Sequence, residues 1–173
     1  LVVTKITGDV LTLAYKLNQF GITTVTVTGN SNGQSVDHNF TVIVQPVDDP
    51  PTLANPIADV NVTEDAGDFL IDLSNTFNDI DDNNASISKV ASSSNPEIVS
   101  TEVNGEILTL HFLAHSYGIS TITVTGTSNG KTIEDSFEVN VTPVDDGPEV
   151  INGIADVSVE EDASDFIVSL TNV

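Results

Sequence analysis

The chain contains no cysteine, methionine or tryptophan, and only four lysines and arginines among its 173 residues. Without cysteine it has no disulfide, no thiolate nucleophile and no Cys-ligated zinc site. This absence is compatible with an extracellular location, because many bacterial surface proteins carry no disulfides. No apolar run is long enough for a membrane-spanning helix, and no signal peptide is recognisable.

The scarcity of basic residues leaves a large charge imbalance. Four Lys and Arg stand against 26 Asp and Glu, for a formal net charge of −22. Nucleic acids and anionic membranes both require a positive surface, so neither is an expected partner. Such a surface favours cations, and it destabilises a compact state by self-repulsion unless counter-ions neutralise it. Val, Ile and Leu are nevertheless plentiful, which argues against a disordered acidic tail.

What the chain does have is an internal repeat. The segment Pro46–Asn75 returns as Pro143–Asn172, and Leu11–Gly33 returns as Leu108–Gly130, with the same offset of 97 residues and no gap. About half of the aligned positions are identical. This period is too long for a solenoid repeat and matches one β-sandwich domain. We therefore expect three parts: residues 1–48 as the C-terminal part of a repeat, 49–146 as a complete repeat, and 147–173 as the N-terminal part of the next. Because the chain then begins inside a repeat, the lack of a signal peptide carries no information.

Alternating apolar and polar residues predict strands throughout the complete repeat, and helical spacing is hard to find. The turn Asn104-Gly105 is a strong hairpin signal. The fold class expected is all-β, as tandem Ig-like or cadherin-like Greek-key sandwiches of seven strands. The expected strands include Val60–Glu64, Phe69–Leu73, Glu97–Val103, Ile107–Phe112, Ile119–Thr125 and Ile133–Val141, with Ile119, Ile122, Val124, Phe137, Val139 and Val141 at or near the core.

Short proline-containing segments join the repeats. They run from Pro46 to Pro51 and from Pro143 to Pro148, and each contains a pair of aspartates. Proline fixes its own φ and restricts the preceding residue, so these linkers should be extended and stiff.

Aspartates also gather in the loop Asn78–Asn83, where they alternate with other residues. Such a loop can bring several carboxylate oxygens near one point, and Ca²⁺ takes six to eight oxygens at flexible angles. An EF-hand is excluded, because a loop starting at Asp79 would have Asn84 where the motif needs Gly and Val90 where it needs Glu. The remaining alternative is a solvated acidic loop.

The order of these motifs resembles the bacterial cadherin-like repeats of the dystroglycan type. The resemblance rests on the linker VDDPP, the strand ending TEDAGD, the strand DFLIDLS, the loop FNDIDDNN and the last strand SFEVNVTPVDD, and it covers the whole chain. It implies secreted or surface-attached bacterial adhesins, and Ca²⁺ between consecutive domains as the cofactor. The implied ligands are Asp48 and Asp49 with Asp79 and Asp81 at the first junction, and Glu64 with Asp145 and Asp146 at the second.

The chain departs from this family in two places. The turn after the long alternating strand carries Ser128-Asn129 where the family has Asp, and the mid-domain acidic motif is replaced by Ala114-His115-Ser116. Both changes lower the number of available ligands.

Features that could suggest an enzyme have simpler explanations. Both G-x-S-x-G matches, Gly29–Gly33 and Gly126–Gly130, recur at the same turn between two strands, whereas a nucleophile elbow needs a following helix. His111 and His115 correspond to Ala14 and Asn18 in the other copy, which favours surface or edge histidines. Adjacent Glu64 and Asp65 should point to opposite faces of a strand, unlike a glycosidase pair. We therefore expect no catalytic residues.

The sequence thus favours a structural spacer in a long extracellular adhesin or filament, stiffened by proline linkers and interdomain calcium. Its expected partners are neighbouring repeats, other copies of the chain, or a polysaccharide or cell surface. The alternative is a carbohydrate-binding or self-associating module. Residues 1–46 and 149–173 carry complementary strands of one repeat, lacking only the part equivalent to Asn78–Glu97, which predicts head-to-tail strand pairing if the two ends are free.

Overall fold

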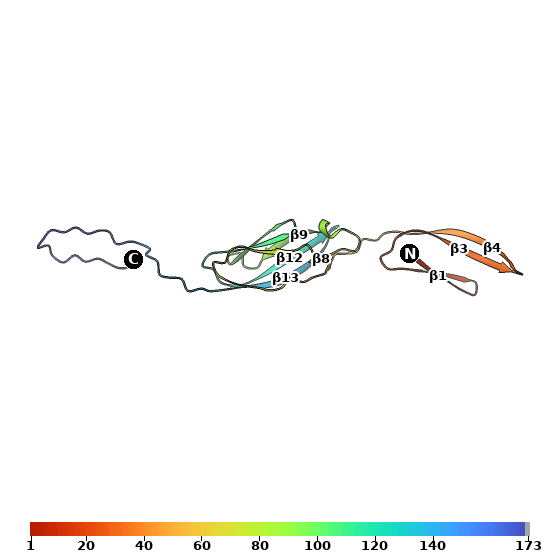
Figure 1. The fold of residues 1–173 in the computed structure, drawn as a ribbon, viewed down its shortest axis with the longest axis horizontal. Helices are drawn as coiled ribbons and strands as arrows, with labels where there is room; N and C mark the ends of the chain where they lie inside the picture. Colours follow the sequence, from red (N-terminus) through yellow and green to blue (C-terminus); the bar gives the residue numbers. More distant parts are fainter. Residues whose placement is uncertain (172–173) are drawn as a thin grey trace.

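The computed structural model describes residues 1–171 as an elongated molecule with three parts in a row (Figure 1). Two hairpins form the N-terminal part, a β-sandwich forms the centre, and an extended stretch follows at the C-terminal end. The last two residues of the segment 147–173, assigned by sequence to a third repeat, lie outside the described residues.

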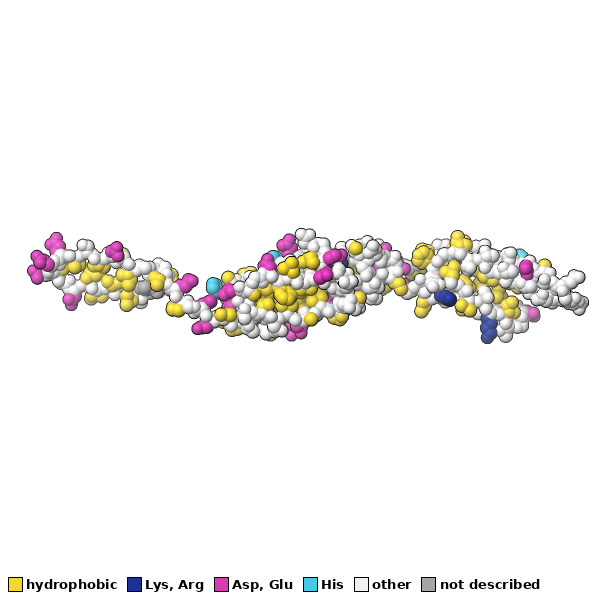
Figure 2. Space-filling model, in the orientation of Figure 1, with side chains coloured by type: hydrophobic (Ala, Val, Ile, Leu, Met, Phe, Trp, Pro, Cys, Tyr) yellow, Lys and Arg dark blue, Asp and Glu magenta, His cyan; other side chains and the backbone are white. Residues whose placement is uncertain are grey.

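The N-terminal part consists of two antiparallel hairpins. They are formed by β1 (Val2–Thr7) with β2 (Val10–Tyr15), and by β3 (Gly21–Ser31) with β4 (Gln34–Val44). Val25 is the one hydrophobic residue buried here within the described chain. The apolar faces of these strands are largely open, as the hydrophobic side chains on this part show in Figure 2.

The central part is a sandwich of a three-stranded and a four-stranded sheet. The first has the order β10-β11-β7 and the second β6-β13-β12-β9, and a short pair, β5-β8, lies beside them. The strands are β5 (Thr52–Leu53), β6 (Val60–Thr63), β7 (Phe69–Asp72), β8 (Phe77–Asn78), β9 (Ser88–Ser93), β10 (Val99–Asn104), β11 (Ile107–Phe112), β12 (Gly118–Ser128) and β13 (Lys131–Thr142), with one 3₁₀ turn, η1 (Asn84–Ser86).

The chain order within these sheets confirms the expected all-β fold. Along the chain, β6 lies in the four-stranded sheet, β7 in the three-stranded sheet and β9 in the four-stranded sheet again. The pairs β10–β11 and β12–β13 are hairpins. β6 pairs in parallel with β13, and the other sandwich pairs are antiparallel. No α-helix occurs in residues 1–171, and no helix in that range is long and apolar enough to cross a membrane.

The core lies between the two sheets of the central part. It is built from alternate residues of each strand, as the pleat requires. Fully buried members are Leu73, Phe77, Val99, Leu108, Leu110, Ile122, Val124, Phe137, Val139 and Val141, all at most 2% exposed. One cation is buried beside them: Lys89 of β9 binds Glu106 of the β10–β11 turn at 2.6 Å, linking the two sheets.

The structure corrects three expectations. Ile119 is 60% exposed, because the inward phase of β12 runs through Ser120, Ile122 and Val124. β9 lacks a clear apolar alternation and was not predicted; it pairs with β12 and so completes the four-stranded sheet. Residues 149–173 were expected to carry the first strands of a repeat; over the described positions 149–171 they form no strand and are exposed, with no partner strand beside them.

Gly126 of β12 is the most tightly packed glycine of the described chain. A Cβ atom at this position would lie 2.6 Å from a ring carbon of Phe77, which is itself 1% exposed. The ring cannot move away without disturbing its own neighbours, because protein interiors are close-packed. Glycine at 126 thus lets β8 approach the four-stranded sheet and fixes where the Asn78–Asn83 loop begins.

We predict that Gly126→Ala destabilises the protein by about 1–3 kcal/mol through this overpacking. Gly67→Ala is the matched control, because a Cβ at Gly67 would meet no atom within 4 Å. Denaturant titration should show a lower midpoint for Gly126→Ala with Gly67→Ala close to the wild type. Equal midpoints for all three proteins would show that Phe77 repacks freely.

Candidate functional site

The sequence places acidic residues at both ends of the central sandwich, and the structure gathers them there (Figure 2). The first junction joins β4 to β5 through the linker containing Asp48 and Asp49. The second follows β13 and contains Asp145 and Asp146. We describe each junction from its own contacts.

At the first junction, the linker is fastened to the loop that follows β8. The backbone N–H of Asp49 donates to Oδ2 of Asp81 at 2.7 Å. Asp79 and Asp81 belong to the same loop, where the N–H of Asp81 donates to Oδ1 of Asp79 at 2.9 Å. The structure therefore brings together Asp49, Asp79 and Asp81.

Asp79 is the unusual residue of this group. It is 5% exposed, and its Oδ1 accepts hydrogen bonds from the N–H groups of both Asp81 and Asp82. The bond from Asp81 is the main reason that the pKa of Asp79 lies below its usual value, although burial acts in the opposite direction. Its second oxygen, Oδ2, is buried and has no hydrogen-bond partner among the described residues. A buried carboxylate oxygen without a partner is costly unless a cation or water meets it.

The β12–β13 turn supplies a second attachment for the linker. Nδ2 of Asn129 donates to Oδ1 of Asp48 and to Oδ2 of Asp82, both at 2.7 Å. Nζ of Lys131 lies 2.9 Å from Oδ2 of Asp48 and also donates to the carbonyl of Asp48. These contacts, with that of Asn129 first, hold the pKa of Asp48 below its usual value.

Two clefts open at this junction. One, of about 290 Å³, is lined by Phe20 of the N-terminal part and by Asp48, Asp81, Asp82 and Asn129. The other, of about 270 Å³, has Asn18, Asp49 and Asp81 among its lining residues. Residues of the N-terminal part and of the central sandwich line each cleft. An ion bound in either cleft would therefore lie between the two parts.

Sequence reasoning missed Asp82, Asn129 and Lys131 as members of the first junction. Asn129 stands in the turn where the cadherin-like repeats have an aspartate. Its side-chain amide nevertheless connects Asp48 with Asp82. Only the internal repeat could have drawn attention to Lys131. Its counterpart in the other copy is the uncharged Gln34, so the strand itself does not require a positive charge at this position.

At the second junction, Glu64 is buried, at 5% exposed, and its Oε1 accepts the N–H of Val144 at 2.6 Å. Glu64 thus holds the linker where it leaves β13. Asp145 lines a cleft of about 500 Å³ with Glu64, His115, Tyr117 and Asp146. The sequence grouped Glu64 with Asp145 and Asp146, and the structure places all three around this cleft.

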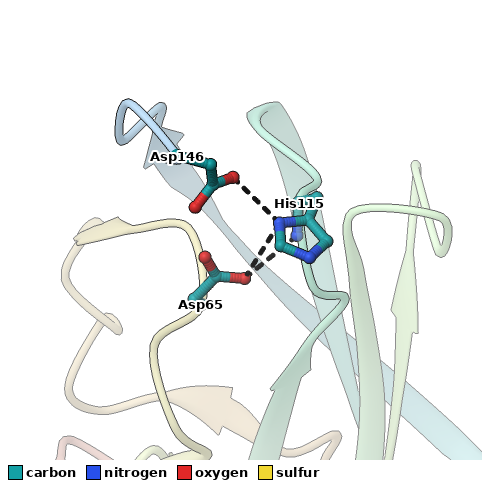
Figure 3. Close-up of side chains that lie close together, drawn as sticks. All are labelled: Asp65, His115 and Asp146. Atoms are coloured by element: carbon teal, nitrogen blue, oxygen red, sulfur yellow. Dashed lines mark hydrogen bonds and ion pairs between the residues drawn. The ribbon is translucent and has the colours of Figure 1, made fainter. Parts of the chain in front are cut away.

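Asp146 itself pairs with a histidine (Figure 3). Nδ1 of His115 lies 3.0 Å from Oδ2 of Asp146 and 3.9 Å from Oδ1 of Asp65, which also accepts the backbone N–H of His115 at 3.0 Å. The hydrogen bond to Asp146 is the largest cause of a raised His115 pKa. His115 lies on the surface, as expected, but its link to Asp65 and Asp146 was not foreseen.

Another histidine, His111, has acidic neighbours of its own on the three-stranded sheet. Its Nδ1 lies 2.9 Å from Oδ1 of Asp68, and its Nε2 lies 3.6 Å from Oε2 of Glu102. The hydrogen bond with Asp68 is the main reason that the His111 pKa is raised above 6.5.

We predict that NMR titration gives His111 a pKa above 6.5, and that Asp68→Asn lowers it. Because folding raises the pKa of His111, its interaction with Asp68 stabilises the folded protein fully below pH 6.5. This stabilisation is lost as the pH rises through the folded-state pKa. An unchanged His111 pKa in Asp68→Asn would contradict the assignment.

Comparison with known proteins gives likeness only at the level of structure. No protein-family model and no curated protein sequence matches the chain. Among solved structures, human protocadherin-24 EC1-2 aligns with 84% of this chain and 77% of its own, at 15% identity and a TM-score of 0.46. The Ig1-2 module of the Drosophila receptor protein tyrosine phosphatase DLAR aligns with 82% and 74%, at 9% identity and a TM-score of 0.38.

An endo-fucoidan hydrolase of glycoside hydrolase family 107 also aligns with the chain, over 88% of it, at 13% identity and a TM-score of 0.40. The chain spans only 23% of the length of that hydrolase. The structural neighbours thus include cadherin and Ig domains, each at a TM-score below 0.5.

Proposed function

We propose that this chain is a segment of an extracellular array of β-sandwich repeats, which acts as a spacer and is stiffened by calcium at its junctions. The observation that carries the calcium proposal is the buried Oδ2 of Asp79, which lacks a hydrogen-bond partner within residues 1–171. The repeat of the whole domain and its linker supports the spacer role.

The residues of the first junction fit a calcium ion by their chemistry. Asp48, Asp49, Asp79 and Asp81 offer carboxylate oxygens, and Asp82 lies in the same loop as Asp79 and Asp81. Ca²⁺ binds such hard oxygen ligands in flexible geometries. When bound, the ion supplies positive charge that offsets repulsion between these carboxylates. Only part of this charge is offset by protein groups, since Lys131 is the one Lys or Arg within ion-pair distance of them among the described residues.

Stiffening would follow from where these ligands lie. Asp48 and Asp49 belong to the linker, whereas Asp79 and Asp81 belong to the central sandwich. An ion held by both would restrict bending at the linker, whose prolines already limit its conformations. At the second junction, Glu64, Asp145 and Asp146 remain the predicted calcium ligands from this repeat.

An extracellular and bacterial location is part of the same proposal. It rests on the resemblance to bacterial cadherin-like repeats, and it agrees with the lack of cysteine and with the strong negative charge. The proposal also holds that the chain is a binding and spacing protein without enzymatic activity.

A second candidate function, self-association, is favoured by the open faces of β1–β4. Val3, Ile6, Val10, Ile22 and Ile43 are each more than half exposed there. Exposed apolar strands with free edges invite pairing with another strand. Sedimentation velocity would distinguish the candidates: an s-value that rises with protein concentration supports self-association, and a constant monomer value opposes it.

We predict that about 10 mM Ca²⁺ stabilises the chain by about 1–3 kcal/mol relative to chelator, as expected for a millimolar or submillimolar site that binds only the folded state. Asp79→Asn should lose most of this gain, since it removes the charge of the buried ligand. Thermal melting with and without calcium measures the effect.

Glu138→Gln is the control for that experiment, because it removes an exposed carboxylate from the middle of β13, away from both junctions. It should keep the full calcium response. Identical melting temperatures of the wild type in calcium and in chelator would refute the calcium proposal, and an equal response of Asp79→Asn and wild type would refute the role of Asp79.

A further inference from the structure

Two histidines of the central sandwich each have two carboxylate neighbours, but the arrangements differ. At His111 the carboxylates face different ring nitrogens, with Asp68 at Nδ1 and Glu102 at Nε2. At His115 both carboxylates approach the same nitrogen, Nδ1, at 3.0 Å for Asp146 and 3.9 Å for Asp65. Figure 3 shows these two carboxylates of Asp65 and Asp146 directed at the ring of His115.

The three donors at His115 come from separate segments of the chain. Asp65 lies between β6 and β7, His115 between β11 and β12, and Asp146 in the linker after β13. One ligand atom from each lies within 4.8 Å of the other two. All three side chains are partly open to solvent, with His115 72% exposed, so an ion and its remaining water ligands can reach them.

The loops position these side chains independently of any ion. Oδ1 of Asp65 accepts the backbone N–H of His115, which fixes one loop against the other. Both residues have a left-handed backbone, with φ of 62° for Asp65 and 54° for His115. The equivalent of His115 in the N-terminal part is Asn18, with the same φ of 54°, so the backbone shape at this position does not require histidine.

We propose that Asp65, His115 and Asp146 form a binding site for a divalent transition-metal ion, with Zn²⁺ as its representative. Nδ1 of His115 and one oxygen from each aspartate provide three ligands, and solvent completes the coordination. Zn²⁺ accepts such mixed nitrogen and oxygen sets with four ligands, and an imidazole nitrogen suits Zn²⁺, Ni²⁺ and Cu²⁺ far better than Ca²⁺. At the second junction this ion would take Asp146 in place of the calcium proposed above, whereas the calcium proposed at the first junction is independent of it.

The charge around this site favours a divalent ion. Glu64 and Asp145 line the same cleft as His115 and Asp146, and no Lys or Arg lies within ion-pair distance of these acids among the described residues. A bound ion would tie the linker, through Asp146, to two loops of the sandwich. The two junctions of this repeat would then differ in the cation they select, because one has Asn18 where the other has His115.

The test is a calorimetric titration of tag-free protein with ZnCl₂, repeated with CoCl₂ to record the visible absorption of a bound Co²⁺ ion. His115→Asn is the informative variant, because asparagine tolerates a positive φ and is the residue found in the other repeat. His111→Ala is the matched control, since it removes the other histidine that has carboxylate neighbours and copies Ala14 of the other repeat. Circular dichroism verifies that both variants fold.

We expect one Zn²⁺ per chain for the wild type and for His111→Ala, with an affinity at least about tenfold weaker in His115→Asn. Asp146→Asn should weaken binding similarly, while calcium binding at the first junction should be unchanged in His115→Asn. No zinc binding by the wild type, or equal affinity in His115→Asn, would overturn the proposal. A loss confined to His111→Ala would assign the ion to the other histidine and would also overturn it.

Discussion

Repulsion between carboxylates at the two ends of the sandwich is the constraint on which the rest of this structure depends. The chain places paired aspartates in each linker and more acids in the loops beside them, with a net charge of −22. Protein groups offset part of this repulsion. Lys131 and Asn129 bind Asp48, backbone N–H groups bind Asp79 and Asp81, and His115 pairs with Asp146. Oδ2 of Asp79 is the oxygen that these groups leave unmet.

The same contacts attach each linker to the sandwich. Bonds from the N–H of Asp49 and from Lys131 hold the entering linker, and the bond from the N–H of Val144 to Glu64 holds the leaving one. A linker held in this way transmits bending or rotation to the adjoining part. The proposed spacing and ion-binding roles would therefore both follow from one arrangement, because the residues that fix the linkers are the residues that offer ligands.

Burial in the core depends on the presence of both sheets. Phe137 of β13 is 2% exposed, and its equivalent Phe40 of β4 is only partly buried, although the two strands have the same alternation of apolar residues. The second sheet that covers Phe137 is represented in the N-terminal part by β1 and β2 alone. The pattern of apolar residues fixes which face turns inward, but the partner sheet decides whether that face is covered.

This explains which features could be predicted from sequence. The repeat and the alternation in β6, β7 and β10–β13 were sufficient for the fold class and most strand positions. β9 was missed because its residues alternate weakly, and its pairing with β12 is a tertiary effect. Ile119 was misplaced because it lies an odd number of residues from Ile122, so the period of two turns it to the opposite face, and Ser120 occupies the inward phase.

The residues of the candidate sites likewise divide into those that the sequence could indicate and those that it could not. Asp79 and Asp81 could be predicted because they stand close together in one loop, and Asp48 and Asp49 because the linker motif repeats. Other members of the two junctions, namely Asp65, His115, Asn129 and Lys131, meet their partners only through the pairing of strands distant in the sequence. No spacing rule within one segment could have found them.

The central claim, that a cation at the first junction stiffens the linker, is tested most directly by a distance measurement across it. Because the chain has no cysteine, spin labels can be placed at Gln34→Cys and Glu138→Cys alone, on β4 and β13. Pulsed electron–electron double resonance would then record the distribution of distances between the two spin labels, once in chelator and once in calcium. We expect the distribution to narrow when calcium is added, and to stay broad in Asp79→Asn. The same distribution in chelator and in calcium would contradict the account.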